Sequence, residues 1–206
     1  LFEIFITFLF WLQGLEYIGN NCYLFRNGIV NFAGLENLSY IGRSLDIEGN
    51  QLLQNLKGIE ELDSIGNWLT ILGNSSITEL TGLESLVYIN GTLNIQNNDL
   101  LIDVSSLSNL INTVEEIKII GNNSLTSLTG LENIDAASIT YLYVHDNPFL
   151  STCEVQSICE HLSANGQAFI QNNAVGCNSP EEVLDSCEAN AVDIPEQFIA
   201  DNLTIY

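Results

Sequence analysis

The chain has 206 residues, of which 46% are hydrophobic, and its mean hydropathy is +0.20. This is enough apolar material for one packed domain or one short repeat array, and it excludes intrinsic disorder. The charge is one-sided, because 26 acidic residues face 4 basic ones and leave a net charge of -22. Such a protein repels phosphate backbones and anionic lipid headgroups, so we exclude nucleic acid as a partner and docking onto acidic membranes.

The first thirteen residues, LFEIFITFLFWLQ, are strongly apolar. They include Glu3 and lack both a basic n-region and a small-residue cleavage site, which disfavours a signal peptide, and they are too short to span a bilayer. Leu9 and Leu12 already fall in phase with the repeat in the rest of the chain. We therefore interpret residues 1–13 as a truncated or degenerate strand of that repeat, and we expect no membrane insertion.

An internal repeat occupies residues 14–150 and continues into the tail. Its clearest copies begin 24 residues apart and are LDIEGN (45–50), LTILGN (69–74), LNIQNN (93–98) and IKIIGN (117–122). LYVHDN (142–147) follows after 25 residues, and the weaker copies CYLFRN (22–27) and AFIQNN (168–173) bring the total to about seven turns. Apolar and polar residues alternate only over the first few positions of each copy, so the pattern predicts one short strand per turn and an irregular return.

Stacking these turns would align equivalent residues in columns inside the molecule. Two columns are aliphatic and consist of Leu53, Ile77, Leu101, Leu125 and Leu150, and of Ile47, Ile71, Ile95, Ile119 and Val144. A third column is polar and consists of Asn27, Asn50, Asn74, Asn98, Asn122, Asn147 and Asn173. Because a buried amide is costly unless it is bonded, we expect each Asn to bond backbone groups of its own turn and of the neighbouring turn.

Four of the five cysteines, Cys153, Cys159, Cys177 and Cys187, lie in the last quarter of the chain. Their spacing matches no zinc signature, so we expect two disulfides, no bound metal, and an extracellular or periplasmic compartment. Three pairings are possible, and we favour Cys153 with Cys177 and Cys159 with Cys187, which would pin the cap over the last turn. Cys22 stands where the repeat places a core leucine, so we interpret it as a small buried hydrophobe.

Residues 151–187 comprise the last turn and a cysteine-rich C-terminal cap, and we predict two short helices in this segment. Ser151 to Glu154 has the pattern of a capping box, and apolar residues then recur at helical spacing as far as Asn165. Ser179 and Pro180 suit the N-cap and the first position of a second helix, from about Pro180 to Cys187. We expect the two helices to cover the open end of the solenoid.

Gly-Leu-Glu or Gly-Ile-Glu recurs in the return segments, at Gly34, Gly58, Gly82 and Gly130. A period near 24 with an Asn column is typical of leucine-rich repeats, and this return segment resembles the receptor L-domain variety. From about Gly14 to Cys187, including the cysteine tail, the chain resembles the secreted leucine-rich-repeat proteins of flavobacteria and related Bacteroidetes. The resemblance implies a mainly β, right-handed leucine-rich-repeat solenoid, an extracellular or cell-surface interaction protein, and neither catalytic centre nor cofactor. Residues 188–206 look like a linker leading to a type IX secretion sorting domain.

The outward positions of the strands form the face on which repeat proteins usually bind partners. Our candidate ligand-binding residues on this face are Tyr143, His145, Phe169, Gln171, Asn94 and Gln96. Neighbouring aromatic side chains of this kind suit a sugar or a protein anchor. The alternative is a solvated sheet whose aromatic rings pack on each other or on the cap.

Catalytic signals are weak. His145 and His161 are the only histidines, and no nucleophile-elbow, zinc-protease or phosphate-loop motif is present. We place His161 on the exposed side of the first cap helix. The interpretation we favour is a secreted or cell-surface module that binds protein or glycan without catalysis, with adhesion as one role. Asp46 and Glu48 form a carboxylate pair, so a polysaccharide-processing β-helix enzyme is the alternative, and a structural spacer is the second alternative.

Overall fold

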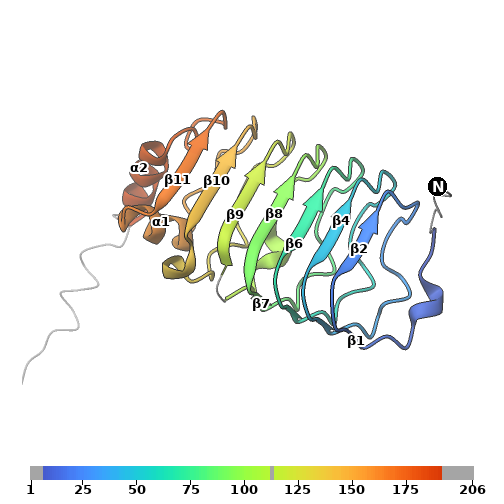
Figure 1. The fold of residues 1–206 in the computed structure, drawn as a ribbon. Helices are drawn as coiled ribbons and strands as arrows, with labels where there is room; N and C mark the ends of the chain where they lie inside the picture. The colour runs from blue at the N-terminus through green and yellow to red at the C-terminus, as the bar shows by residue number, and fades with distance from the viewer. Residues whose placement is uncertain (1–6, 112–113, 192–206) are drawn as a thin grey trace, which may run out of the picture.

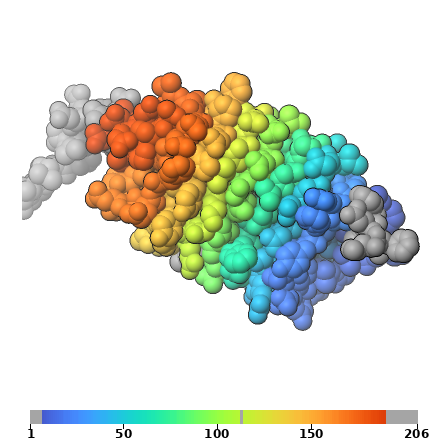
Figure 2. Space-filling view, turned by 45° about the horizontal axis from the view of Figure 1, so that its top comes forward, coloured from blue at the N-terminus to red at the C-terminus, as the bar shows by residue number. Residues whose placement is uncertain are grey.

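The computed structural model describes residues 7–111 and 114–191, which form a parallel β solenoid (Figure 1). In this part of the chain seven parallel strands share one sheet, in the order β11-β10-β9-β8-β6-β4-β2. The strands are β2 (Cys22–Phe25), β4 (Leu45–Glu48), β6 (Leu69–Leu72), β8 (Gly91–Gln96), β9 (Val114–Ile120), β10 (Tyr141–His145) and β11 (Gln167–Gln171). The predicted solenoid and its strand positions are confirmed, and the solenoid has about six turns where we expected about seven. Its turns pack side by side as slanted bands (Figure 2).

A second parallel sheet runs along the return segments. Its strands within the described residues are β1 (Tyr17–Ile18), β3 (Tyr40–Ile41), β5 (Ser64–Ile65) and β7 (Tyr88–Ile89), in that order. The predicted strand is present in each of these turns, and a second strand of two residues, which we did not predict, is added to it. The signal for the second strand is a single Ile at the same phase of each return, and two residues are too short a segment for alternation to be read.

The interior consists of the predicted columns. Ile47, Ile71, Ile95, Ile119 and Val144 are all fully buried, as are Leu53, Ile77, Leu101, Leu125 and Leu150. The parallel register places each of the Ile47-type residues directly beside its equivalents on the neighbouring strands. A single turn cannot bury its apolar side chains by itself, so these contacts between neighbouring turns stabilise the fold.

The Asn column is also inside the molecule, and Asn50, Asn74, Asn98, Asn122 and Asn147 are fully buried. The Oδ1 atom of Asn98 accepts the backbone N–H of Asn74, at 3.0 Å, and its Nδ2 donates to the carbonyls of Ile71, at 2.9 Å, and Gln96, at 3.0 Å. The other buried members bond in the same way. The predicted ladder is therefore confirmed, and every buried side-chain nitrogen and oxygen of the described residues has a partner.

A second side-chain ladder lies in the returns and was not anticipated. The carboxylates of Glu36, Glu60, Glu84 and Glu132 each accept the backbone N–H of the glycine two residues earlier, at 2.7 to 2.8 Å. Those glycines have φ between 109° and 113°, and a Cβ on Gly58 would strike the carbonyl of Phe32 in the preceding turn. The Gly-x-Glu pattern thus permits close stacking of the turns and satisfies the amide that this backbone conformation exposes.

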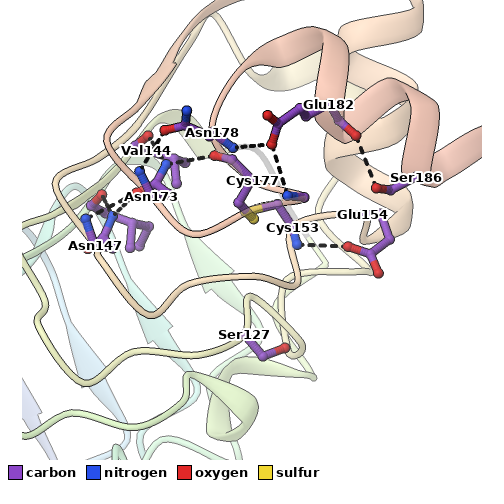
Figure 3. Close-up of a disulfide and its surroundings, with 12 residues drawn as sticks. Ser127, Val144, Asn147, Cys153, Glu154, Asn173, Cys177, Asn178, Glu182 and Ser186 are labelled. Carbon is purple, nitrogen blue, oxygen red and sulfur yellow. Dashed lines mark hydrogen bonds between the residues drawn. A yellow bond between two sulfur atoms is a disulfide. The ribbon is translucent and has the colours of Figure 1, made fainter.

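The cap contains both favoured disulfides, Cys153–Cys177 and Cys159–Cys187, among the described residues. Figure 3 shows the first of them. Asn173 continues the Asn ladder into it, because its Nδ2 donates to the carbonyls of Val144 and Cys177. Cys22 is a free cysteine that packs half-buried against the core, and burial raises its pKa to about 11. The interpretation of Cys22 as an apolar core residue agrees with this environment.

The cap helices differ from the prediction in three respects. Helix α1 (Gln156–Ser163) begins after Val155, and the expected capping box does not form, because Glu154 accepts the N–H of Cys153 instead. Helix α1 follows β10, where the sequence placed it, but it forms the return to β11. Of the two helices that we expected over the open end, only α2 (Pro180–Ala191) therefore follows the last strand (Figure 1). The N-cap of α2 is as predicted, with the Ser179 hydroxyl accepting the N–H of Glu182 at 3.2 Å, but the helix continues past Cys187.

His161 is buried, at 3% exposure, so its predicted exposed position is wrong. It lies on the same face of α1 as Ser157, Ile158 and Leu162, and that face packs into the last turn. Its Nε2 lies 3.2 Å from the carbonyl oxygen of Gln167. The helical periodicity contained this answer, because a residue three positions after Ile158 and four after Ser157 shares their face.

At the other end, the segment before β1 contains a 3₁₀ helix, η1 (Phe10–Leu12), and no strand within residues 7–13. Leu9 is buried, and its carbonyl lies against Gly34 as that of Phe32 lies against Gly58. Residues 7–13 are thus in phase with the returns of the later turns. The strand that we predicted within residues 1–13 is therefore absent from residues 7–13. The rest of that prediction concerns residues 1–6, which lie outside the described residues.

Candidate binding surface

The outward face of the large sheet carries parallel rows of side chains, one residue from each strand. The register aligns one row as Tyr23, Asp46, Thr70, Asn94, Lys118, Tyr143 and Phe169, and the next as Phe25, Glu48, Leu72, Gln96, Ile120, His145 and Gln171. All the predicted candidate residues lie in these two rows. A row that we did not predict precedes them and includes Thr92, Glu116, Tyr141 and Gln167. Trp68 stands at the equivalent position, two residues before Thr70. This row could have been found by extending the period-two alternation two residues towards the start of each strand.

Four of the candidates, Tyr143, His145, Phe169 and Gln171, lie together on β10 and β11. His145 and Phe169 make an edge-to-face contact with ring centroids 5.2 Å apart. Tyr143 is half-buried, because it stacks on Tyr141 at 6.1 Å and the Lys118 Nζ atom lies 5.8 Å from its ring. The aromatic rings therefore pack partly on each other, and a depression of about 160 Å³ lies between Tyr141, Tyr143 and Phe169.

Asn94 and Gln96 do not belong to this aromatic patch. They lie on β8, with β9 between them and β10, and the Gln96 Nε2 atom donates to the Asn94 Oδ1 atom at 2.5 Å. Asn94 lines a different depression of about 360 Å³, which extends across β4, β6, β8 and β9. The residues lining it are Asp46, Trp68, Thr70, Thr92, Asn94, Glu116 and Lys118. The sheet face thus carries an aromatic patch near the cap and a polar depression near its centre.

The electrostatics of the central depression come from one ion pair and one carboxyl group. The Lys118 Nζ atom lies 2.6 Å from the Glu116 Oε2 atom, and this bond lowers the pKa of Glu116 below its ordinary value. The Thr92 hydroxyl donates to the same oxygen at 3.2 Å. Burial raises the pKa of Asp46, and a hydrogen bond with Thr70 opposes part of that rise. The depression therefore offers both donors and acceptors in fixed positions.

The remaining polar contacts on the face are local. The His145 Nδ1 atom lies 2.8 Å from the Asp146 Oδ2 atom, and hydrogen bonds with Asn172 and then His145 lower the pKa of Asp146. Asp46 and Glu48 share the outward face in adjacent rows. The described residues include no group of three His, Cys, Asp or Glu side chains placed to hold a metal ion. These contacts orient side chains on the surface.

No protein-family model, no curated protein and no solved structure matches the chain. In the part of the chain that the structure describes, no helix combines the length and the apolar character needed to cross a membrane. The disulfides Cys153–Cys177 and Cys159–Cys187 indicate an oxidising environment.

Proposed function

We propose that the chain is a secreted or cell-surface recognition module of the leucine-rich-repeat type, which binds protein or glycan without catalysis on the outward face of its large sheet. One observation carries this proposal. Each inward position holds the same kind of residue in turn after turn, whereas the adjacent outward positions hold acids, amides, hydroxyls, a cation and aromatic rings. The fold specifies the inward positions, and the outward ones remain available for a partner.

The period of 24 residues, the bonded Asn column and the Gly-x-Glu returns support the leucine-rich-repeat assignment. The secreted Bacteroidetes variety is proposed from the resemblance of the chain, including its cysteine tail. An extracellular or cell-surface location is supported by the disulfides of the cap. Adhesion is one role that a flat, extended face of this kind serves. The enzyme alternative rests on Asp46 and Glu48, and the spacer alternative needs no partner at all.

The test compares two faces of the same solenoid. Tyr143→Ala with Phe169→Ala alters the aromatic patch, and Leu100→Ala with Phe149→Ala removes exposed side chains from the loops that follow the strands. Each protein is screened against neutral, acidic and amino-sugar glycans and against a panel of extracellular proteins, with thermal melting as the check on folding.

We expect a ligand whose binding weakens after substitutions on the sheet face, in the aromatic patch or the central depression, and not after the loop substitutions. Loss of binding with the loop pair alone, or no ligand at all, contradicts the proposal. Turnover of a polysaccharide that is abolished by Asp46→Asn or Glu48→Gln would establish the enzyme alternative instead.

A further inference from the structure

The central depression differs from the rest of the sheet face in its lining. It measures about 360 Å³, at the lower end of the range of about 300 to 1,000 Å³ that is usual for small-ligand sites. Its lining is polar except for one aromatic ring, that of Trp68, which stands just before β6. Because the depression lies on the face proposed as the recognition surface, a ligand assigned to it rests on the proposed function and makes that function more specific.

Trp68 provides a fixed, exposed apolar surface. Half of its area is open to solvent, although it is one of the largest apolar side chains in the chain. Its Cδ1 atom lies 3.0 Å from the place that a Cβ would occupy on Gly91, at the start of β8. The absence of a side chain at Gly91 therefore lets the indole lie close against the next strand, which limits the positions the ring can take. A ring held in this way loses little entropy when a ligand stacks on it.

The polar groups around Trp68 are held as well. Glu116 is fixed by Lys118 and Thr92, Asn94 is bonded by Gln96, and Asp46 is bonded by Thr70. A carboxylate oxygen has more than one lone pair and an ammonium group has three protons, so these groups can bond a ligand without giving up their present partners. Donors and acceptors stand side by side at the spacing of neighbouring strands, about 4.8 Å.

We propose that this depression binds a neutral pyranose unit of an oligosaccharide. The C–H side of the sugar ring stacks on the Trp68 indole, whose face is electron-rich, and the ring hydroxyls bond Asp46, Asn94 and the Glu116–Lys118 pair. A hydroxyl both donates and accepts, so it matches a lining that alternates between the two. A charged ligand matches it less well, because Glu116 and Lys118 already neutralise each other.

The charges in and around the depression also favour a neutral sugar over acidic sugars and basic peptides. Sulfated or uronic-acid sugars meet two carboxylates in the lining and a net charge of -22 on the whole chain. A basic peptide suits the overall charge, but within the lining Asp46 is the only carboxylate without a cationic partner among the described residues. A peptide lysine would therefore meet one acid and the Lys118 ammonium, and would leave the hydroxyl and amide groups unmatched.

The chain allows a direct measurement, because it contains only Trp11 and Trp68. Trp11→Phe leaves Trp68 as the sole indole, so its fluorescence reports on the depression. The probes are neutral oligomers of glucose, mannose and N-acetylglucosamine, together with uronic-acid oligomers, glucosamine oligomers and oligolysine. We expect a saturable change in Trp68 emission with at least one neutral oligomer, and no change with the uronic-acid oligomers or with oligolysine.

Affinity measured by calorimetry then locates the site. Trp68→Ala is expected to weaken the neutral oligomer about tenfold, as befits a lost stacking contact, and Trp68→Phe less so. Asn94→Ala should weaken it too, whereas Trp11→Ala and Gln54→Ala, at exposed positions away from the sheet face, should not. Thermal melting of every variant separates lost binding from lost folding.

Binding of oligolysine in place of the sugars, or sugar binding that depends on Tyr143 and Phe169 and not on Trp68, overturns the sugar site and leaves the recognition face standing. The same holds if the neutral sugars fail while a protein ligand binds and is lost on substitution of the sheet face. The absence of any ligand on that face overturns both proposals.

Discussion

The inside and the outside of the same strands carry opposite kinds of sequence. On β4, β6 and β8, the inward residues Ile47, Ile71 and Ile95 are identical and fully buried. One position earlier, at Asp46, Thr70 and Asn94, the outward residues share neither charge nor shape. Because a solenoid places copies of one position side by side, the chain provides its own comparison between what the fold requires and what it leaves open.

The largest effect is expected in the Asn ladder. Asn98→Leu leaves the buried N–H of Asn74 without a partner and removes the bonds that the Asn98 amide donates to the carbonyls of Ile71 and Gln96. At about 1 to 3 kcal/mol for the unsatisfied N–H and about 0.5 to 1.5 kcal/mol for each lost bond, the free energy of unfolding should fall by about 2 to 6 kcal/mol. Urea denaturation followed by circular dichroism measures this change.

The matched control lies on the same strand. Asn94→Leu makes the same chemical change on the outward face, where the side chain bonds only Gln96 within the described residues. Its free energy of unfolding should stay within about 0.5 kcal/mol of that of the unsubstituted protein. Equal losses at Asn98 and Asn94 would contradict the division of the strand into a structural side and an open side.

A smaller effect is expected in the returns, where two adjacent glutamates allow the same comparison. Glu60 accepts the N–H of Gly58 at 2.8 Å and belongs to the repeated ladder, whereas Glu61 is exposed and makes no side-chain bond among the described residues. Glu60→Ala should lower the free energy of unfolding by about 0.5 to 1.5 kcal/mol. Glu61→Ala removes the same charge and should have almost no effect on the melting temperature, so a shared loss would point to charge and not to the Gly58 bond.

The sequence predicted those parts of the fold that recur. The strands of the large sheet, the aliphatic columns and the Asn ladder were predicted correctly, because several copies of one signal support each other. The disulfide pairing has no second copy, and the favoured choice among three possible pairings is the one the structure contains. The errors fall where a feature has one copy or a very short length. The expected capping box occurs only once in the chain, and Glu154 accepts the N–H of the adjacent Cys153 instead. The strand at Tyr40–Ile41 is too short to show alternation.

The candidate binding surface was predictable only in part. The register of the outward rows follows from the strand positions, which is why Tyr143, His145 and Phe169 were brought together correctly. Trp68 was missed because it precedes the recognisable strand motif, and its neighbours in the depression come from other turns. Which outward residues share a hollow depends on twist and side-chain packing, and one sequence does not report either.

The smallest expected effect concerns Asp46, an outward residue that the fold does not favour in its charged form. Burial raises its pKa, so the folded protein holds the proton more tightly than the unfolded chain does. The stabilising contribution is therefore complete below the ordinary Asp pKa of about 3.9 and is lost as the pH rises through the higher pKa of the folded state. At neutral pH the charged carboxylate disfavours folding.

Asp46→Asn should accordingly raise the melting temperature slightly at pH 7 and leave it unchanged near pH 3. Thr70→Val removes the hydrogen bond that opposes the rise in pKa, so it should move the pH dependence to higher values. A melting-temperature difference for Asp46→Asn that does not vary with pH would show that burial of the charge is not its cause. Residues that bind a ligand often lower the stability of the fold, and an outward carboxylate that disfavours folding fits this pattern. The Asp46→Asn protein should therefore bind the ligand less tightly while it melts at a higher temperature.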